Sequence, residues 1–134
     1  IDLDKRVNLN QVNRNQRFTF NFSFITSEKK YSLQGIGSSG SKVHKKLLEK
    51  LELLSKQDKT EIYLLPRESG LERIPASEVS ISVNTEFLTS HRDDGLADTF
   101  WVFRLNKLGR VIGKIRDNVF YVMAIDTKFD AYQH

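Results

Sequence analysis

Five basic residues stand close together in the C-terminal third of the chain, with no acidic residue among them. They are Arg104, Lys107, Arg110, Lys114 and Arg116. Guanidinium and ammonium groups bind phosphate oxygens through charge and hydrogen bonds, and such contacts supply much of the affinity of proteins for nucleic acids. These five residues are therefore the candidate nucleic-acid contacts.

A strand over residues 110–116 would arrange part of this set in a row. Side chains alternate between the two faces of a strand, so Arg110, Lys114 and Arg116 would share one face over ~20 Å. A row of cations on this scale suits a phosphate backbone. The alternative is a solvated sheet face whose charges prevent edge-to-edge aggregation, and the sequence leaves both interpretations open.

The last nine residues combine carboxylates, an amine, a phenol and an imidazole. Cleavage of RNA without a metal needs a base for the 2′-hydroxyl proton, a cation beside the phosphate and an acid for the leaving oxygen. The candidates for both the base and the acid are His134 and Tyr132. The candidates for the cation are Arg110, Arg116 and Lys128. The alternative is a frayed terminus in which Tyr132 only covers the sheet.

Metal and cofactor chemistry finds little support in the sequence. The chain has no cysteine, which excludes thiolate catalysis, cysteine-ligated zinc and disulfide scaffolds. His44 and His91 have no set of ligands near them, so we expect no metal site and no cofactor. The loop at 35–40 matches the G-x-G-x-x-G pattern of phosphate-binding loops, but no buried strand precedes it. We interpret it as a helix-capping loop, with phosphate binding as the alternative.

The elements that position these groups follow from the pattern of apolar residues. Residues 1–16 are polar and rich in Asn, which predicts a mobile or docked N-terminal arm. Residues 17–134 then form one α+β domain. Phenylalanine alternates with polar residues over 18–24, a period of two that predicts a strand over 18–25 with one face in the core.

Two helices are predicted next. Apolar residues at helical spacing predict the first over 41–54. Asp58 can cap a shorter second helix, which must end before Pro66 because the residue that precedes a proline avoids helical geometry. A strand over 62–65 is the alternative for this second segment.

Three strands close the sequence. They are predicted at 100–105, 110–116 and 119–125, and the short turns between them favour antiparallel neighbours. Before them, the acidic segment at 70–98 is predicted to be irregular, with one short strand at 79–83. We therefore predict an α+β fold, an antiparallel sheet with a C-terminal three-stranded meander and two helices packed on one face.

The composition is typical of a globular protein. The chain has 134 residues, 39% hydrophobic residues and a formal net charge of +4. Its apolar runs are too short to cross a bilayer, so we expect a soluble, cytoplasmic protein without membrane contact. The positive charge suits RNA or another polyanion. The missing initiator Met leaves open whether Ile1 is the native N-terminus.

The order of one strand, two helices and a basic C-terminal meander resembles the RelE/ParE superfamily of bacterial toxins. The most specific part is GRVIG at 109–113 and the apolar strand at 119–125, which look like the family's arginine strand, turn and apolar strand. The resemblance covers residues 17–134 and implies cleavage of messenger RNA by side chains on the sheet and at the C-terminus. By resemblance, these side chains are those of Arg110, Arg116, Lys128, Tyr132 and His134.

Three functions follow as hypotheses. The leading one is an RNA-directed, metal-independent endoribonuclease of toxin type, with a protein inhibitor as a further partner. The second is a non-catalytic nucleic-acid-binding module that uses the same basic sheet. The third is a protein-interaction module, in which the acidic segment meets a basic partner or the basic strand meets an acidic inhibitor.

Overall fold

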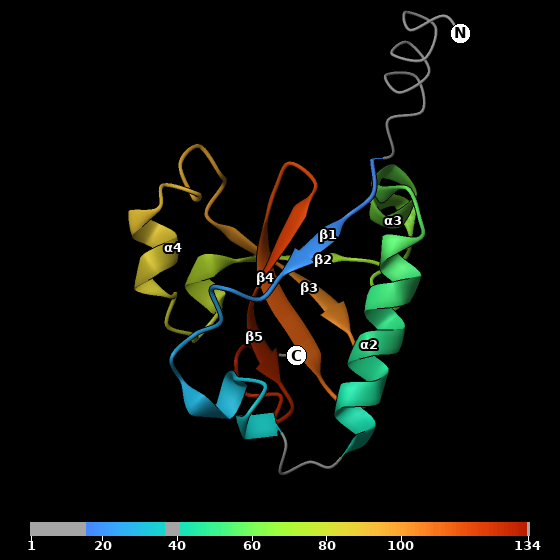
Figure 1. Ribbon diagram of the computed structural model, residues 1–134, viewed down its shortest axis with the longest axis horizontal. Helices are drawn as coiled ribbons and strands as arrows, with labels where there is room; N and C mark the ends of the chain where they lie inside the picture. The colour runs from blue at the N-terminus through green and yellow to red at the C-terminus, as the bar shows by residue number, and fades with distance from the viewer. Residues whose placement is uncertain (1–15, 37–40, 134) are drawn as a thin grey trace, which may run out of the picture.

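Five strands form one sheet in the order β1-β5-β4-β3-β2 in a computed structural model of the chain, which describes residues 16–36 and 41–133 (Figure 1). Residues 1–15 of the predicted N-terminal arm lie outside the described residues. The sheet and its helices confirm the predicted α+β class. The strands are β1 (Thr19–Asn21), β2 (Glu72–Pro75), β3 (Thr99–Arg104), β4 (Arg110–Arg116) and β5 (Val119–Asp126).

The predicted C-terminal meander is confirmed. β3 pairs antiparallel with β4 and β4 with β5, and the strand bounds agree with the prediction to within one residue. Asn106 and Asp117, in the two connecting turns, each have φ 55°. Asn and Asp adopt this left-handed conformation more readily than most other residues, which explains why these strands can turn back within a few residues.

β1 is shorter than predicted, and it makes the sheet mixed because it runs parallel to β5. The strand ends early because Asn21 Oδ1 accepts a hydrogen bond from the backbone N–H of Ser23 (2.8 Å), an arrangement that turns the chain. Phe18 then packs on one face of the sheet and Phe24 on the other. The phenylalanines of this segment therefore pack in two different hydrophobic cores, one on each face of the sheet.

Both predicted helices are confirmed, and they cover one face of the sheet (Figure 1). They are α2 (Ser41–Ser55) and α3 (Lys59–Leu64). Asp58 caps α3 as predicted, because its Oδ1 accepts a hydrogen bond from the backbone N–H of Thr60 (2.8 Å). The alternative strand over 62–65 is wrong. Among the described residues, no helix has both the length and the apolar character needed to cross a bilayer.

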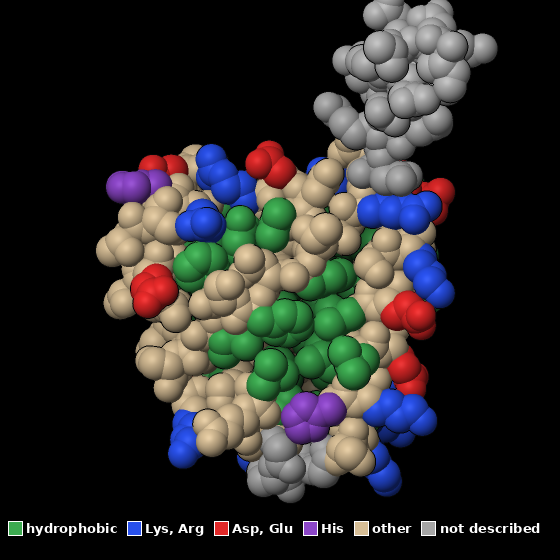
Figure 2. Space-filling view, viewed as in Figure 1, with side chains coloured by type: hydrophobic (Ala, Val, Ile, Leu, Met, Phe, Trp, Pro, Cys, Tyr) green, Lys and Arg blue, Asp and Glu red, His purple; other side chains and the backbone are tan. Residues whose placement is uncertain are grey.

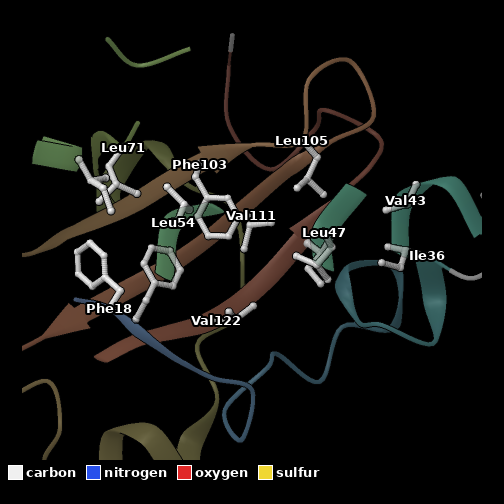
Figure 3. Packing of buried hydrophobic residues seen from close by; sticks show 13 residues of the cluster. Phe18, Ile36, Val43, Leu47, Leu54, Leu71, Phe103, Leu105, Val111 and Val122 are labelled. Carbon is white, nitrogen blue, oxygen red and sulfur yellow. The ribbon is translucent and has the colours of Figure 1, made fainter. Parts of the chain in front are cut away.

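A first hydrophobic core lies between the sheet and these two helices (Figure 3). Burial of apolar side chains in a core of this kind is the main source of folding free energy. Apolar side chains also reach the surface beside this core, and Figure 2 shows a group of them between β1 and α2. The core residues include Phe18, Leu47, Leu54, Phe103, Val111 and Val122.

A second core covers the opposite face of the sheet, which the sequence analysis did not predict. On this face, the core lies between the sheet and a layer formed by η1 (Lys29–Tyr31), η3 (Ala76–Glu78), α4 (Thr85–Thr89) and the chain after β5 (Figure 1). Fully buried Phe87 of α4 packs here with Ile112 and Met123 from the sheet.

The predicted strand at 79–83 is wrong. Val79, Ile81 and Val83 do alternate with exposed serines and pack against the second core, as the period of two requires. However, this segment pairs with no strand of the described sheet, and Ser80 instead donates a hydrogen bond to the carbonyl of Ala131 (2.6 Å). An extended segment without a ladder of such bonds is not a strand.

Candidate functional site

The row of cations predicted on β4 is divided between separate environments. Ile112, which shares a face with Arg110 and Lys114, belongs to the second core. Lys114 is only 8% exposed, and its ammonium lies 4.5 Å from the centre of the Phe100 ring. β4 therefore presents no continuous strip of cations to solvent.

Arg116 lies at the opposite end of β4 from Arg110, and the structure does not bring the two together. Its guanidinium donates hydrogen bonds to the carbonyl oxygens of Arg92 and Asp94. The Arg92 guanidinium in turn lies 5.0 Å from the centre of the Phe24 ring. Arg116 thus holds the loop before β3 against the sheet.

Arg104 and Arg110 do meet, because they face each other across β3 and β4. Both line a recess of about 330 Å³ at the end of the sheet. We call this recess the arginine recess, and its lining residues are Arg67, Glu72, Arg104, Arg110, Tyr132 and Gln133. It brings together three residues that the sequence analysis selected, Arg104, Arg110 and Tyr132.

The Arg110 side chain is held in place by its surroundings. Its Nη1 donates hydrogen bonds to the carbonyl oxygens of Asn106 (2.8 Å) and Gly109 (3.0 Å). Its guanidinium carbon also lies 5.0 Å from the centre of the Phe129 ring. Phe129 has φ 58°, a strained conformation for a bulky residue that persists only where surrounding contacts outweigh the strain. The guanidinium is therefore positioned before any ligand binds.

Positive charge is in excess in the arginine recess. Three guanidinium groups and one carboxylate line it, and Glu68, which does not line it, also lies 3.6 Å from Arg67. The Glu72 carboxylate lies 3.6 Å from Arg67 Nη1 and 3.9 Å from Arg104 Nη2. The Nε atoms of Arg104 and Arg110 are buried and have no hydrogen-bond acceptor among the described residues. These arginines keep charge and hydrogen-bonding capacity for an anion.

Asp126 explains how the end of the chain returns to this recess. Its carboxylate is fully buried and accepts hydrogen bonds from the backbone N–H groups of Lys128 (3.0 Å) and Ala131 (2.9 Å). A carboxylate that accepts two amide bonds fixes a tight turn. The turn brings Tyr132 back to the sheet, where it lies between the second core and the recess.

The surroundings of Tyr132 favour the neutral phenol over the phenolate. Burial raises the pKa of its hydroxyl, and the negative charge of Glu72 raises it further. The nearby guanidinium groups of Arg110 and Arg104 act in the opposite direction without reversing the shift. A phenol with a raised pKa keeps its proton at neutral pH.

The other predicted site residues lie outside the recess or outside the described residues. Lys107 and Lys128 are exposed, in the turns after β3 and after β5. His134 lies outside the described residues, and so do Gly37 and Gly40 of the glycine-rich loop. Gly35 of that loop is required by packing, since an added Cβ would lie 1.8 Å from the Lys29 carbonyl oxygen.

Arg67, Glu72 and Gln133 also line the recess, although no pattern in the sequence marked them as site residues. Arg67 lies in the turn after α3, which is held by a hydrogen bond from the Lys50 ammonium to the carbonyl of Ser69 (2.9 Å). Burial lowers the pKa of Lys50, and the positive charge of Lys46 lowers it further. No spacing in the sequence links these residues to β4. Glu72 reaches the recess through the pairing of β2 with β3, and Gln133 through the turn that Asp126 holds after β5.

The chemistry of the recess suits an anion better than a metal. Among the described residues, no group of three or more His, Cys, Asp or Glu side chains is arranged to hold a metal ion. Guanidinium groups repel cations and bind oxyanions through charge-assisted hydrogen bonds. A phosphate group is the ligand that these donors would fit.

The chain was compared with protein-family models, with curated proteins and with solved structures, and none of the three comparisons found a match. The resemblance to the RelE/ParE superfamily therefore stays a prediction from the order of elements. The geometry of the arginine recess is the basis on which a function is proposed.

Proposed function

We propose that the protein is a metal-independent endoribonuclease that holds a phosphate of its RNA substrate in the arginine recess. The observation that carries this proposal is the convergence of Arg104, Arg110 and Tyr132 on one positively charged recess. Guanidinium groups hold phosphate oxygens and stabilise the extra negative charge of the transition state, while a neutral phenol can protonate a leaving oxygen.

The surroundings of the recess favour a chain of nucleotides over an isolated phosphate. A second recess of about 410 Å³ shares Glu72, Tyr132 and Gln133 with the arginine recess and continues along β2. This space would receive the nucleoside next to the bound phosphate. The exposed Lys107 and Lys128 follow β3 and β5, which finish at the same end of the sheet, since Arg104 and Asp126 both pair with Arg110. They would contact further phosphates.

The first prediction tests the proposal with purified protein and a labelled single-stranded RNA in the presence of EDTA. We expect cleavage, and we expect Arg104→Ala and Arg110→Ala each to slow it by about 100-fold or more, because each removes a donor to the transition state. Arg17→Ala is the matched control, since it removes an exposed arginine that does not line the recess. Loss of activity in EDTA, or full activity in both recess variants, would contradict the proposal.

Nucleic-acid binding without cleavage is the second candidate, favoured by the exposed Lys107 and Lys128 beside the recess. In that case the affinity for RNA should fall steeply with salt while no new RNA ends appear. Binding that is insensitive to salt would reject this second candidate.

A further inference from the structure

Glu72 is an acidic side chain in a recess that otherwise suits anions. It lies at the start of β2, and its side chain is 22% exposed. Its distances of 3.6 Å to Arg67 and 3.9 Å to Arg104 exceed those of hydrogen bonds, so neither arginine holds it in a tight bidentate pair. A site that only bound phosphate would be stronger with a neutral residue here, because two negative charges repel.

Glu72 also lies close to a proton donor. Glu72 and Tyr132 both line the arginine recess and the adjoining recess, so the two side chains flank the boundary between them. The negative charge of Glu72 is also one of the causes that raise the pKa of Tyr132. A proton acceptor and a proton donor therefore stand beside the guanidinium groups that would hold a phosphate.

We propose that Glu72 is the general base and Tyr132 the general acid of RNA cleavage, an assignment that rests on the proposed endoribonuclease function. Glu72 accepts the proton of a 2′-hydroxyl group. The freed 2′-oxygen forms a bond to the phosphorus of the phosphate held by Arg104 and Arg110. The bond from phosphorus to the 5′-oxygen of the next nucleotide breaks, and this oxygen takes the Tyr132 proton.

The products are a 2′,3′-cyclic phosphate and a free 5′-hydroxyl group. One proton is gained by Glu72 and one is lost by Tyr132, and exchange with solvent restores both groups. No water molecule, metal or redox partner is consumed. The base is thus a β2 residue, in contrast to the earlier prediction, which sought the base in His134 or Tyr132.

The test compares the full chain with Glu72→Gln and Tyr132→Phe on the same RNA in EDTA. We expect Glu72→Gln to slow cleavage by about 100-fold or more, with RNA binding unchanged or tighter because a negative charge is removed. Tyr132→Phe should slow cleavage as well while its ring still fills the buried site. Glu68→Gln is the matched control, since Glu68 also lies 3.6 Å from Arg67 but does not line the recess.

Two further measurements make the outcomes distinct. An RNA with a 2′-O-methyl group at the cleaved position should bind without being cut, and Glu72→Ala should regain cleavage when formate is added in place of the lost carboxylate. Full cleavage by Glu72→Gln would overturn the role of Glu72 while leaving the endoribonuclease function in place. A wild-type protein that binds RNA and never cleaves it would overturn both the function and the assignment.

Discussion

Two carboxylates hold the residues that follow β5. Asp126 accepts hydrogen bonds from backbone amides of its own segment. Asp130 accepts a hydrogen bond from the Tyr31 hydroxyl (2.7 Å) and lies 3.3 Å from the Lys30 ammonium, so it ties this segment to η1. These two contacts join residues 99 and 100 positions apart in the chain. Tyr132 reaches the arginine recess because both ends of its turn are anchored.

At the residue scale we predict that Tyr31→Phe lowers the free energy of unfolding by about 1 kcal/mol at neutral pH, through loss of one hydrogen bond. This bond is also the main cause that lowers the pKa of Asp130 below its ordinary value of 3.8. A carboxyl group whose pKa is lower in the folded protein than in the unfolded protein stabilises the fold at a pH above its unfolded-state pKa. This stabilisation is lost as the pH falls through the folded-state pKa.

Urea unfolding of both proteins, at neutral pH and well below pH 3.8, measures this effect. The difference between wild type and Tyr31→Phe should shrink in acid as Asp130 becomes protonated. An equal difference at both pH values would show that the hydroxyl stabilises the fold independently of the Asp130 charge.

At the element scale, the pairing of β4 with β5 changes register between Ile112 and Gly113. Ile112 pairs with Ala124 and Gly113 with Val122, so Met123 is an additional residue on β5. Side chains of consecutive strand residues normally alternate between the two faces of a sheet. The additional residue interrupts this alternation, so Met123 and Ala124 both pack in the second core, while Val122 packs in the first.

Gly113 makes this close pairing feasible. A Cβ at this position would lie 2.3 Å from the Tyr121 carbonyl oxygen and 2.5 Å from the Phe120 ring. We predict that Gly113→Ala lowers the free energy of unfolding by about 3 kcal/mol, because the backbone of β5 must move. Gly95→Ala is the comparison, since no atom lies within 4 Å of its added Cβ and only its φ of +76° is unfavourable. Thermal or urea unfolding that ranks Gly95→Ala as the costlier change would contradict this view of the bulge.

On the scale of the whole molecule, the sheet is a central layer with apolar cover on both faces. α4 has five residues, too few for a helix that is stable without packing. Its fully buried Phe87 contacts the rings of Phe24 and Tyr121, at 5.4 Å between centroids in each case. Phe87 therefore anchors α4 and part of the cover over the second face.

We predict that Phe87→Ala lowers the free energy of unfolding by about 3–5 kcal/mol, the usual cost of removing a buried aromatic side chain. Leu88→Ala on the same helix is the matched control, because Leu88 is 45% exposed and its loss should change stability by less than about 0.5 kcal/mol. Urea unfolding followed by circular dichroism measures both. A small effect of Phe87→Ala would mean that α4 contributes little to the second core.

The sequence by itself determined the elements that depend on local rules. The helical spacing of apolar residues was sufficient to predict α2. Asp58 and Pro66 were sufficient to predict where α3 begins and ends, because helix caps and helix-terminating residues act within a few residues. The alternation of apolar and polar residues, together with the short turns, was sufficient to predict the C-terminal meander. The set of cations from Arg104 to Arg116 was likewise visible from residue types alone.

Only the tertiary structure decided which of these cations meet. β2 has four residues, too few to show a period, and it is a strand because β3 lies beside it. That pairing carries Glu72 to Arg104, while the second core separates Arg110 from Lys114 and Arg116. Contacts between distant segments leave no local pattern in a sequence, so the arginine recess emerges only when the strands are placed side by side.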